Sequence, residues 1–192
     1  MLASGICDSL CGTPSPVRSQ GNLCVLKADE VYIISHGHEP TLSEMLVVAV
    51  NDPELIAHAH SKGARGINMA GICCTSNETL VREGIPSAGN FLHQELAILT
   101  GAVEAMVVDV QCIMQALPNL AGNFHTEIIT TSPKAKIQGA THIPFDEHNA
   151  LEVARQIVRR AIANYPNRQT TTLPDLVSDA VPGFSTDSTN YL

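Results

Sequence analysis

Three apolar runs that each stop at histidine or cysteine constrain the fold of this chain more than any other feature. Each run has four or more residues suited to a buried parallel strand, and a helix-like segment follows each of them. Open parallel sheets place ligands beyond the carboxyl ends of their strands, so the three stops predict a site at one edge of a sheet. The runs are VYIIS before His36-Gly37-His38, RGINMAG before Ile72-Cys73-Cys74-Thr75, and AMVVDV before Gln111-Cys112.

The rest of the pattern predicts strands and helices in alternation. Asn51-Asp52 before Pro53 is typical of a helix start, and Asp146 precedes the most regular apolar stripe. We expect strands at residues 31–35, 65–71, 105–110, 127–131 and 141–144, and helices at 41–50, 53–61, 77–82, 92–99, from after 112 to about 120, and 147–164. This order predicts an α/β fold: a doubly wound, mostly parallel sheet with helices on both faces (Rossmann-like) and irregular N- and C-terminal ends.

Length and composition favour one domain with an aliphatic core. The 192 residues are 44% hydrophobic but include only four Phe, three Tyr and no Trp, which suits a parallel sheet covered on both faces. We expect an irregular lead-in at residues 1–28, a Rossmann-like domain at 29–168, and a tail without periodicity at 169–192.

Several classes of function are disfavoured. The net charge is −8, and the sequence has no basic patch that would bind nucleic acid or an anionic membrane. No apolar run approaches the roughly 20 residues of a membrane span. The first residues lack a secretory signal, so we expect a cytoplasmic protein whose six cysteines are thiols or metal ligands. Dinucleotide, P-loop and serine-hydrolase motifs are not found in the sequence.

The strand-end residues predict a site for a soft metal. Thiolate and imidazole suit zinc, copper and iron-sulfur clusters, not magnesium or calcium. Adjacent Cys73 and Cys74 cannot easily aim at one iron from a regular turn, so one is expected to ligate while the other packs. Gly37 would let backbone approach a bound group closely. The alternative, that the cysteines are small buried hydrophobes and the histidines satisfied polar residues, stays open on pattern alone.

Other polar residues are weaker candidates. His93 and His125 could relay protons or cap helices, and Asp109 within a strand needs a partner, for which the backbone donors of the Cys112 turn are plausible. Cys7 and Cys11 are spaced C-x3-C but have no second pair nearby, so we interpret them as incidental thiols, and Cys24 as a small buried one.

Four longer stretches of the sequence resemble a known family. The stretches are HGHEPTLSEM, KGARGINMAGICCTSNE, REGIPSAGNFLHQELAILTGAVEAMVVDVQCIM and FHTEIITTSPKAKIQGATHI. Together they resemble the anaerobic nickel-iron-sulfur carbon monoxide dehydrogenase catalytic subunit, and the resemblance runs from about Leu10 to Leu192. The resemblance implies that His38 and Cys74 bind the pendant iron of the active-site cluster and that Cys112 binds its cubane portion. His36, Cys73, His93 and Asp109 are expected around these ligands.

The resemblance implies oxidation of carbon monoxide with water to carbon dioxide, two protons and two electrons, and its reverse. Electrons would leave through further 4Fe-4S clusters to a ferredoxin-like acceptor, and the family suggests a homodimer. The remaining ligands and clusters belong to N- and C-terminal domains that this chain does not contain, with residues 169–192 as a linker toward the second of them.

Three protein ligands cannot close such a cluster, so the chain alone is expected to be inactive and to need the missing domains or a split partner. Two alternatives stay open: a non-catalytic metal or iron-sulfur binding module, and a relic with an intact fold and an empty site.

Overall fold

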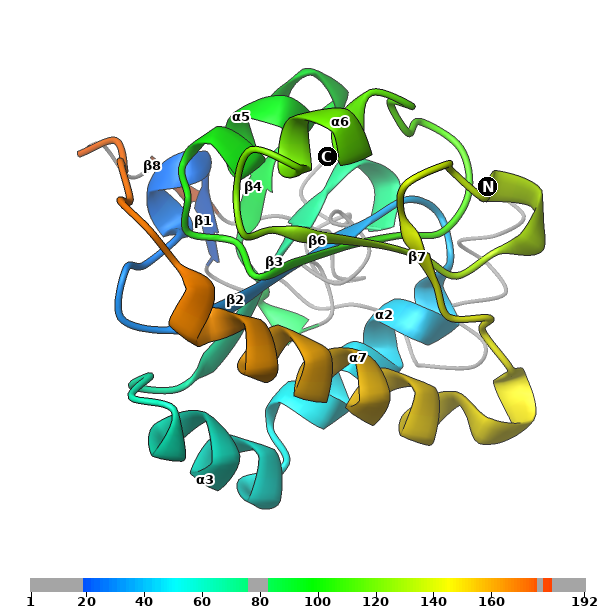
Figure 1. Ribbon diagram of the computed structural model, residues 1–192, viewed down its shortest axis with the longest axis horizontal. Coiled ribbons are helices and arrows are strands. Elements are labelled where there is room, and N and C mark those ends of the chain that lie inside the picture. Colours follow the sequence, from blue (N-terminus) through cyan, green and yellow to red (C-terminus); the bar gives the residue numbers. More distant parts are fainter. Residues whose placement is uncertain (1–18, 76–82, 176–177, 181–192) are drawn as a thin grey trace, which may run out of the picture.

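A twisted sheet of eight strands runs through the molecule, with helices above and below it (Figure 1). The computed structural model describes residues 19–75, 83–175 and 178–180. The strand order is β7-β6-β5-β2-β3-β4-β1-β8; the strands from β7 to β1 pair in parallel and β8 pairs antiparallel to β1. The strands are β1 (Ser19–Gly21), β2 (Val31–His36), β3 (Ile67–Ile72), β4 (Ser87–Gly89), β5 (Ala105–Val108), β6 (Glu127–Thr130), β7 (Thr141–His142) and β8 (Ser178–Ala180).

Helices cover both faces of this sheet. One layer holds α2 (Pro40–Val50), α3 (Pro53–Ser61) and α7 (Ala150–Asn164), and the other holds α5 (Gln94–Leu99) and α6 (Leu117–Ala121) (Figure 1). Short 3-10 turns complete the described elements: η1 (Leu23–Val25), η2 (Phe91–His93), η3 (Pro133–Ala135), η4 (Glu147–Asn149) and η5 (Tyr165–Asn167).

Alternation along β2 divides the core in two. Val31 and Ile33 pack in the cluster that contains α2, α3 and α7, whereas Tyr32 and Ile34 pack in the cluster that contains α5 and α6. Successive side chains of a strand point to opposite faces, so this continuous apolar run can serve both layers at once. His36 lies two residues after Ile34 in the same strand, so its side chain points to the same face as those of Tyr32 and Ile34, toward the α5 and α6 layer.

The predicted fold class is confirmed: a doubly wound, mostly parallel sheet has helices on both faces. The Asp52 cap of α3 and the Asp146 cap before η4 also form as expected, since each carboxylate accepts a backbone N–H two residues on. Some boundaries differ from the prediction. β5 stops at Val108 instead of residue 110, and α6 begins only at Leu117 instead of directly after residue 112. The predicted helix at 77–82 lies outside the described residues.

Short edge strands are the main addition to the predicted elements. β1 lies inside the segment expected to be an irregular lead-in, and β8 lies inside the segment expected to be a tail. β4 lies between two predicted helices, where no strand was predicted. Each of these strands has three residues, too few to show a period of two, so their pairing depends on the neighbouring strands rather than on local pattern.

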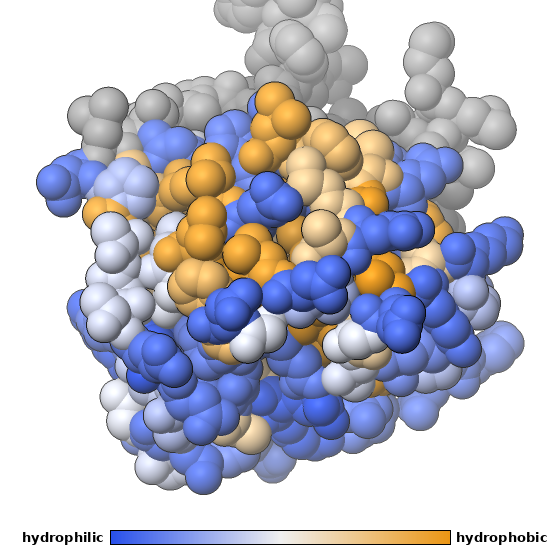
Figure 2. Space-filling view, turned by 45° about the horizontal axis from the view of Figure 1, so that its top comes forward, coloured by the Kyte–Doolittle hydropathy of each residue, from blue (hydrophilic) through white to orange (hydrophobic). Residues whose placement is uncertain are grey.

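The helical layer of α5 carries an apolar surface. Figure 2 shows apolar side chains gathered on the face that α5 and α6 cover. Phe91, Leu92, Leu96 and Leu99 are exposed there. None of the helices in the described part of the chain has the length and hydropathy needed to cross a membrane.

A buried ion pair closes the rim where the strands begin. Glu104, just before β5, is fully buried; one of its oxygens accepts hydrogen bonds from Arg168 Nε (2.8 Å) and His125 Nε2 (3.0 Å), and the other from the Tyr32 backbone N–H (2.5 Å). Arg168 also donates to the Ala28 carbonyl (2.7 Å) and covers the Tyr165 ring. The network therefore joins the starts of three strands to the segment that follows α7.

Replacing Arg168 by methionine should destabilise the fold strongly. The substitution keeps much of the packing but leaves the Glu104 carboxylate buried without its cation, which costs about 3–5 kcal/mol. The measurement is the free energy of unfolding in urea. Arg159→Met is the matched control, because Arg159 pairs with Glu152 on the surface and its loss should cost under about 1 kcal/mol. Equal losses for the two variants would contradict the structural role given to the buried pair.

Candidate functional site

The carboxyl end of β2 lies at the switch point of the sheet. β2 pairs with β3 on one side and β5 on the other, and the chain builds β3 and β4 on the first side before it crosses to β5, β6 and β7. In doubly wound sheets, ligands bind in the crevice at such a point. The His36-Gly37-His38 turn, the Cys73-Cys74 turn and the loop that carries Cys112 all leave from these three central strands.

Backbone hydrogen bonds join the three turns. The Thr75 N–H, next to Cys74, donates to the Gly37 carbonyl (3.0 Å), and the Asp109 N–H donates to the His36 carbonyl (3.2 Å). The turn after β2 is therefore tied to the turn after β3 and to the loop after β5. The three predicted ligand-bearing segments are brought together at one rim.

Asp109 forms the closest link between two of these segments. Its carboxylate accepts the N–H groups of His38 (2.6 Å) and Glu39 (2.9 Å), and also that of Val110. The sequence predicted donors from the Cys112 loop, and Val110 is one of them. The other two donors come from the turn after β2, about 70 residues away in sequence. Asp109 is 3% exposed, so these charge-assisted bonds offset the cost of burying the carboxylate.

Gly37 makes this link possible. Its φ is +138°, and a Cβ built on it would lie 1.7 Å from Asp109 Oδ1. The open space at this glycine was expected to admit a bound group, but the Asp109 side chain fills it. Only glycine can combine this backbone conformation with so close a neighbour.

His38 is oriented by one of its two ring nitrogens. Its Nδ1 lies 3.1 Å from the Val110 carbonyl oxygen, which is an acceptor only, so Nδ1 carries the proton. In the neutral ring, Nε2 then has the lone pair that can bind a metal. The ring is half-buried.

Each ring nitrogen of His36 lies near a backbone carbonyl instead. Its Nε2 lies 2.8 Å from the Cys112 carbonyl and its Nδ1 3.4 Å from the Ile72 carbonyl, and the residue is fully buried. Burial lowers the pKa of His36, so the neutral ring has a single N–H, which the shorter distance assigns to Nε2. His36 thus ties the end of β2 to the loop that carries Cys112.

The two adjacent cysteines differ in their environment. Cys74 is exposed, whereas Cys73 is half-buried and packs against the core on the α5 side, with a φ of 66°. Burial raises the pKa of the Cys73 thiol to about 11, and the neighbouring thiolates of Cys112 and Cys74 add to the shift. Cys73 is therefore a neutral thiol at pH 7, which agrees with the prediction that one cysteine of the pair packs.

Strained backbone is concentrated at the cysteine turns. Within the described ranges, four non-glycine residues have positive φ, and three of them are Cys73, Gln111 and Cys112. The left-handed conformation costs roughly 1–2 kcal/mol per residue, so it persists only where surrounding contacts hold it. Strain of this kind clusters at functional sites, and Cys112 is exposed at the end of such a segment.

The remaining histidine candidates have structural partners. His93 Nδ1 accepts the Asn90 N–H (3.0 Å) in a capping box that starts η2. It lies near the end of β4, and its contacts explain it as a cap. His125 pairs with Glu104 at the opposite rim and takes no part in the site. Sequence reasoning missed Gln94, a fully buried side chain at the start of α5 that contacts the Cys112 loop; a polar residue opening a helix has no local pattern that reveals this role.

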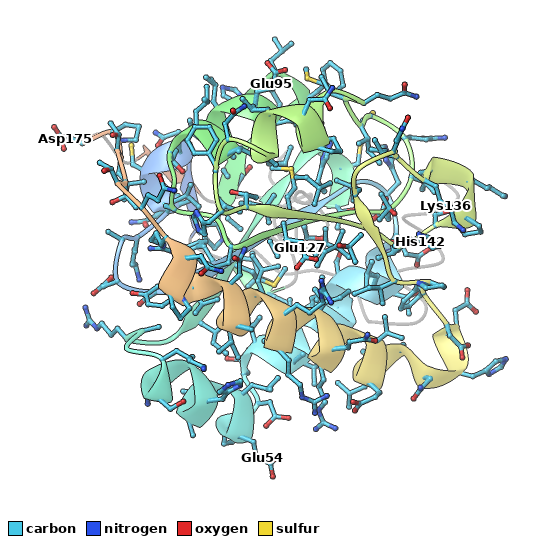
Figure 3. The ribbon with its side chains drawn as sticks, viewed as in Figure 1. Glu54, Glu95, Glu127, Lys136, His142 and Asp175 are labelled. Carbon is cyan, nitrogen blue, oxygen red and sulfur yellow. The ribbon has the colours of Figure 1, made fainter. Side chains whose placement is uncertain are left out.

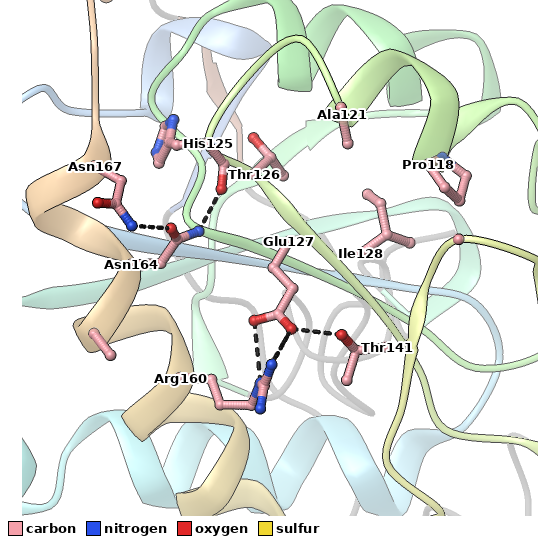
Figure 4. A pocket seen from close by; sticks show the side chains of 13 residues that line it. Pro118, Ala121, His125, Thr126, Glu127, Ile128, Thr141, Arg160, Asn164 and Asn167 are labelled. Carbon is pink, nitrogen blue, oxygen red and sulfur yellow. Dashed lines mark hydrogen bonds and ion pairs between the residues drawn. The ribbon is translucent and has the colours of Figure 1, made fainter.

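A cavity of about 560 Å³ lies at the amino end of β6, away from the cysteine turns. Its lining includes Glu127, which sits between the sheet and α7 (Figure 3). Figure 4 shows the Glu127 carboxylate paired with Arg160 and accepting the Thr141 hydroxyl (2.6 Å). These side chains satisfy one another, so the cavity does not compete with the crevice as the candidate site.

The imidazole and thiol donors at this rim are of the kinds that soft metals and iron-sulfur clusters bind. No group of three or more His, Cys, Asp or Glu side chains within residues 19–75, 83–175 and 178–180 is arranged to hold one metal ion. The thiolates of an iron-sulfur cluster bind different irons and need not meet at one point. The ligand roles of His38, Cys74 and Cys112 stay a prediction.

The fold and this rim define a doubly wound α/β protein with imidazole and thiol side chains gathered at its switch point. The sequence profile of the Prismane/CO dehydrogenase family matches residues 1–185, and the chain belongs to that family.

Several relatives are similar over nearly the whole chain. Carbon monoxide dehydrogenase 1 of Methanosarcina mazei is 56% identical over 190 residues, which are 98% of this chain and 30% of that protein. The solved structure of carbon monoxide dehydrogenase IV from Carboxydothermus hydrogenoformans aligns with a TM-score of 0.93 and 50% identity, over 97% of this chain and 30% of that one.

A third relative, also a solved structure, aligns with a TM-score of 0.93 and 44% identity, over 97% of this chain and 28% of that one. That structure has NiZn[Fe4S4] and NiNi[Fe4S4] clusters in closed and open alpha subunits of acetyl-CoA synthase/carbon monoxide dehydrogenase. The chain thus spans about 30% of the length of the relatives it matches.

Gly37→Ala should cost at least about 2 kcal/mol of unfolding free energy, since the new Cβ collides with Asp109 and the backbone conformation is strained. Gly63→Ala is the control: its φ is +89°, but no atom lies within 4 Å of the new Cβ. Strain alone should cost it about 1 kcal/mol. If urea unfolding gave the two variants equal losses, the close packing of Gly37 on Asp109 would not be important for stability.

Alkylation of the metal-free chain at pH 8 should modify Cys74 and Cys112 well before Cys73. A rise in pKa from 9.0 to about 11 lowers the thiolate fraction of Cys73 about a hundredfold, and the thiolate is the nucleophile. The Cys73 rate should keep rising up to about pH 11, where the folded thiol titrates. Tandem mass spectrometry after iodoacetamide treatment locates the label. The control is the unfolded chain, in which Cys73 and Cys74 should react alike; a fast Cys73 in the folded chain would contradict its burial as a neutral thiol.

Proposed function

We propose that this chain is the cluster-bearing part of an anaerobic carbon monoxide dehydrogenase, with His38, Cys74 and Cys112 as ligands. When bound, a nickel-iron-sulfur cluster would supply the redox chemistry for oxidation of carbon monoxide with water to carbon dioxide, two protons and two electrons. The observation that carries the proposal is the hydrogen-bonded junction of the three ligand-bearing turns at the switch point of the sheet.

The residues at this rim fit such a group. Iron and nickel accept imidazole and thiolate ligands, and the free Nε2 of His38 and the two exposed thiols are donors of these kinds. The backbone behind them is rigid because Asp109 links the His38 turn to the Cys112 loop. The family match and the cluster described for the structural relative support the same assignment.

The neighbouring residues would orient the ligands. The Val110 carbonyl would keep the proton of the neutral His38 ring on Nδ1 and so leave Nε2 available as a metal donor. His36 ties the Cys112 carbonyl to the end of β2, and Cys73 packs as a neutral thiol beside Cys74. His93 would act only at a distance, through the start of α5. These residues bind and position, and the redox step belongs to the cluster.

The remaining ligands and clusters would come from polypeptide outside the matched segment. The chain spans about 30% of its relatives, which leaves room for further 4Fe-4S clusters on separate domains or on a split partner. We propose a ferredoxin-like electron acceptor and a homodimer on the resemblance to the family. We also propose a cytoplasmic location, because thiolate ligands need a reducing compartment.

A segment exchange tests the proposal. The chain replaces the matching segment of the Methanosarcina mazei relative, and the purified protein is assayed without oxygen for reduction of methyl viologen by carbon monoxide. Activity is expected, and His38→Ala, Cys74→Ala and Cys112→Ala should each lower it at least about a hundredfold, more than the loss of an outer partner does. Iron and nickel contents are measured in parallel.

Cys24→Ala is the matched control, because Cys24 is a half-buried thiol in η1, far in sequence from the three turns, and its loss should leave activity unchanged. An inactive exchange protein that folds and carries the full set of metals would contradict the proposal. Full activity in all three ligand variants would contradict the residue assignment.

A further inference from the structure

Gln94 contacts the Cys112 loop through both ends of its amide. The side chain opens α5 and is fully buried. Its Nε2 donates to the Cys112 carbonyl (2.9 Å) and to the Phe91 carbonyl (2.9 Å), while its Oε1 accepts the Met114 N–H (3.1 Å). Two of these three hydrogen bonds thus reach a loop 18–20 residues away in sequence, and the third stays within the turn before α5.

That loop cannot hold its shape by itself. It lies between the end of β5 at Val108 and the start of α6 at Leu117, outside both regular elements. Gln111 and Cys112 are consecutive left-handed residues with φ of 59° and 52°, and neither is glycine. A conformation that unfavourable relaxes to an extended or right-handed one unless outside contacts prevent it.

Two donors from different elements fix the Cys112 carbonyl. His36 Nε2 at the end of β2 lies 2.8 Å from this oxygen, and Gln94 Nε2 at the start of α5 lies 2.9 Å from it. A carbonyl oxygen has two lone pairs, so both are used. These two donors fix the peptide plane that follows Cys112, and Gln94 Oε1 also holds the Met114 N–H. Together these bonds set the direction in which the Cys112 side chain leaves the backbone.

We propose that Gln94 is a positioning residue that holds Gln111 and Cys112 in the left-handed conformation and so sets the direction of the exposed Cys112 side chain. The role deepens the proposed function and rests on it only as far as Cys112 is a cluster ligand. Glutamate could not replace Gln94, because a carboxylate does not donate to the Cys112 carbonyl. Methionine would keep the length of the side chain and lose all three hydrogen bonds.

The test compares Gln94→Met with the double variant Gln94→Met/Gln111→Gly by NMR of the metal-free chain. In Gln94→Met, the Cα and Cβ chemical shifts of Gln111 and Cys112 should leave the left-handed range, and the Met114 amide should exchange at least about tenfold faster. Glycine adopts positive φ without a penalty, so the double variant should restore the Cys112 shifts while the Met114 amide stays fast.

Asn164→Leu is the control for a lost buried amide. Asn164 Nδ2 donates to the Glu104 carbonyl (2.9 Å) and to the His125 carbonyl at the opposite rim, so its loss should leave the Gln111 and Cys112 shifts unchanged. A second measurement uses the segment-exchange protein, which contains the remaining ligands, and records the iron retained per subunit after anaerobic treatment with ferrous iron and sulfide. It should fall in Gln94→Met, recover in the double variant and stay at the wild-type level in Asn164→Leu.

Unchanged shifts in Gln94→Met, or no recovery in the double variant, would overturn the role of Gln94. A segment-exchange protein with Gln94 intact that retains no iron would instead count against the proposed function, and the chemical shifts alone would then decide the role of Gln94.

Discussion

The site depends on one buried carboxylate shared by two loops. Asp109 leaves the end of β5 and accepts backbone N–H groups from His38 and Glu39 on the turn after β2. A carboxylate withdrawn from water needs such donors, so the two loops cannot move apart without exposing an unsatisfied charge. Gly37 provides the space for this contact. The rigidity of the rim is thus a consequence of electrostatics at a single side chain and of one missing Cβ.

The two rims of the sheet have different tasks. At the amino ends, Glu104, Arg168 and His125 form an internally satisfied ionic network that joins segments far apart in sequence. At the carboxyl ends, the thiols of Cys74 and Cys112 stay exposed and the backbone at Gln111 and Cys112 is strained. The ionic network holds the amino rim and the Asp109 carboxylate holds the carboxyl rim, where surrounding contacts keep the backbone at Gln111 and Cys112 in an unfavourable conformation.

Much of the fold could be predicted because local patterns of apolar and capping residues determine it. Apolar runs such as Val31 to Ile34 predict buried strands, Asp52 before Pro53 predicts a helix start, and the stripe in α7 predicts an amphipathic helix. β1, β4 and β8 could not be predicted, since three residues contain no usable period. The pairing of Asp109 was predicted only in part, because two of its donors follow a different strand.

The sequence by itself determined which side chains stand at the ends of the strands, because hydrophobic periodicity marks where each strand stops. The tertiary structure decided what those side chains can do. Placing β2 between β3 and β5 gives His36 the Cys112 carbonyl, His38 the Val110 carbonyl and Asp109 the His38 N–H. These bonds join residues more than 70 positions apart, and their existence depends on strand order, which alternation within a strand does not encode. The same holds for Gln94, whose role exists only because α5 packs beside the loop that carries Cys112.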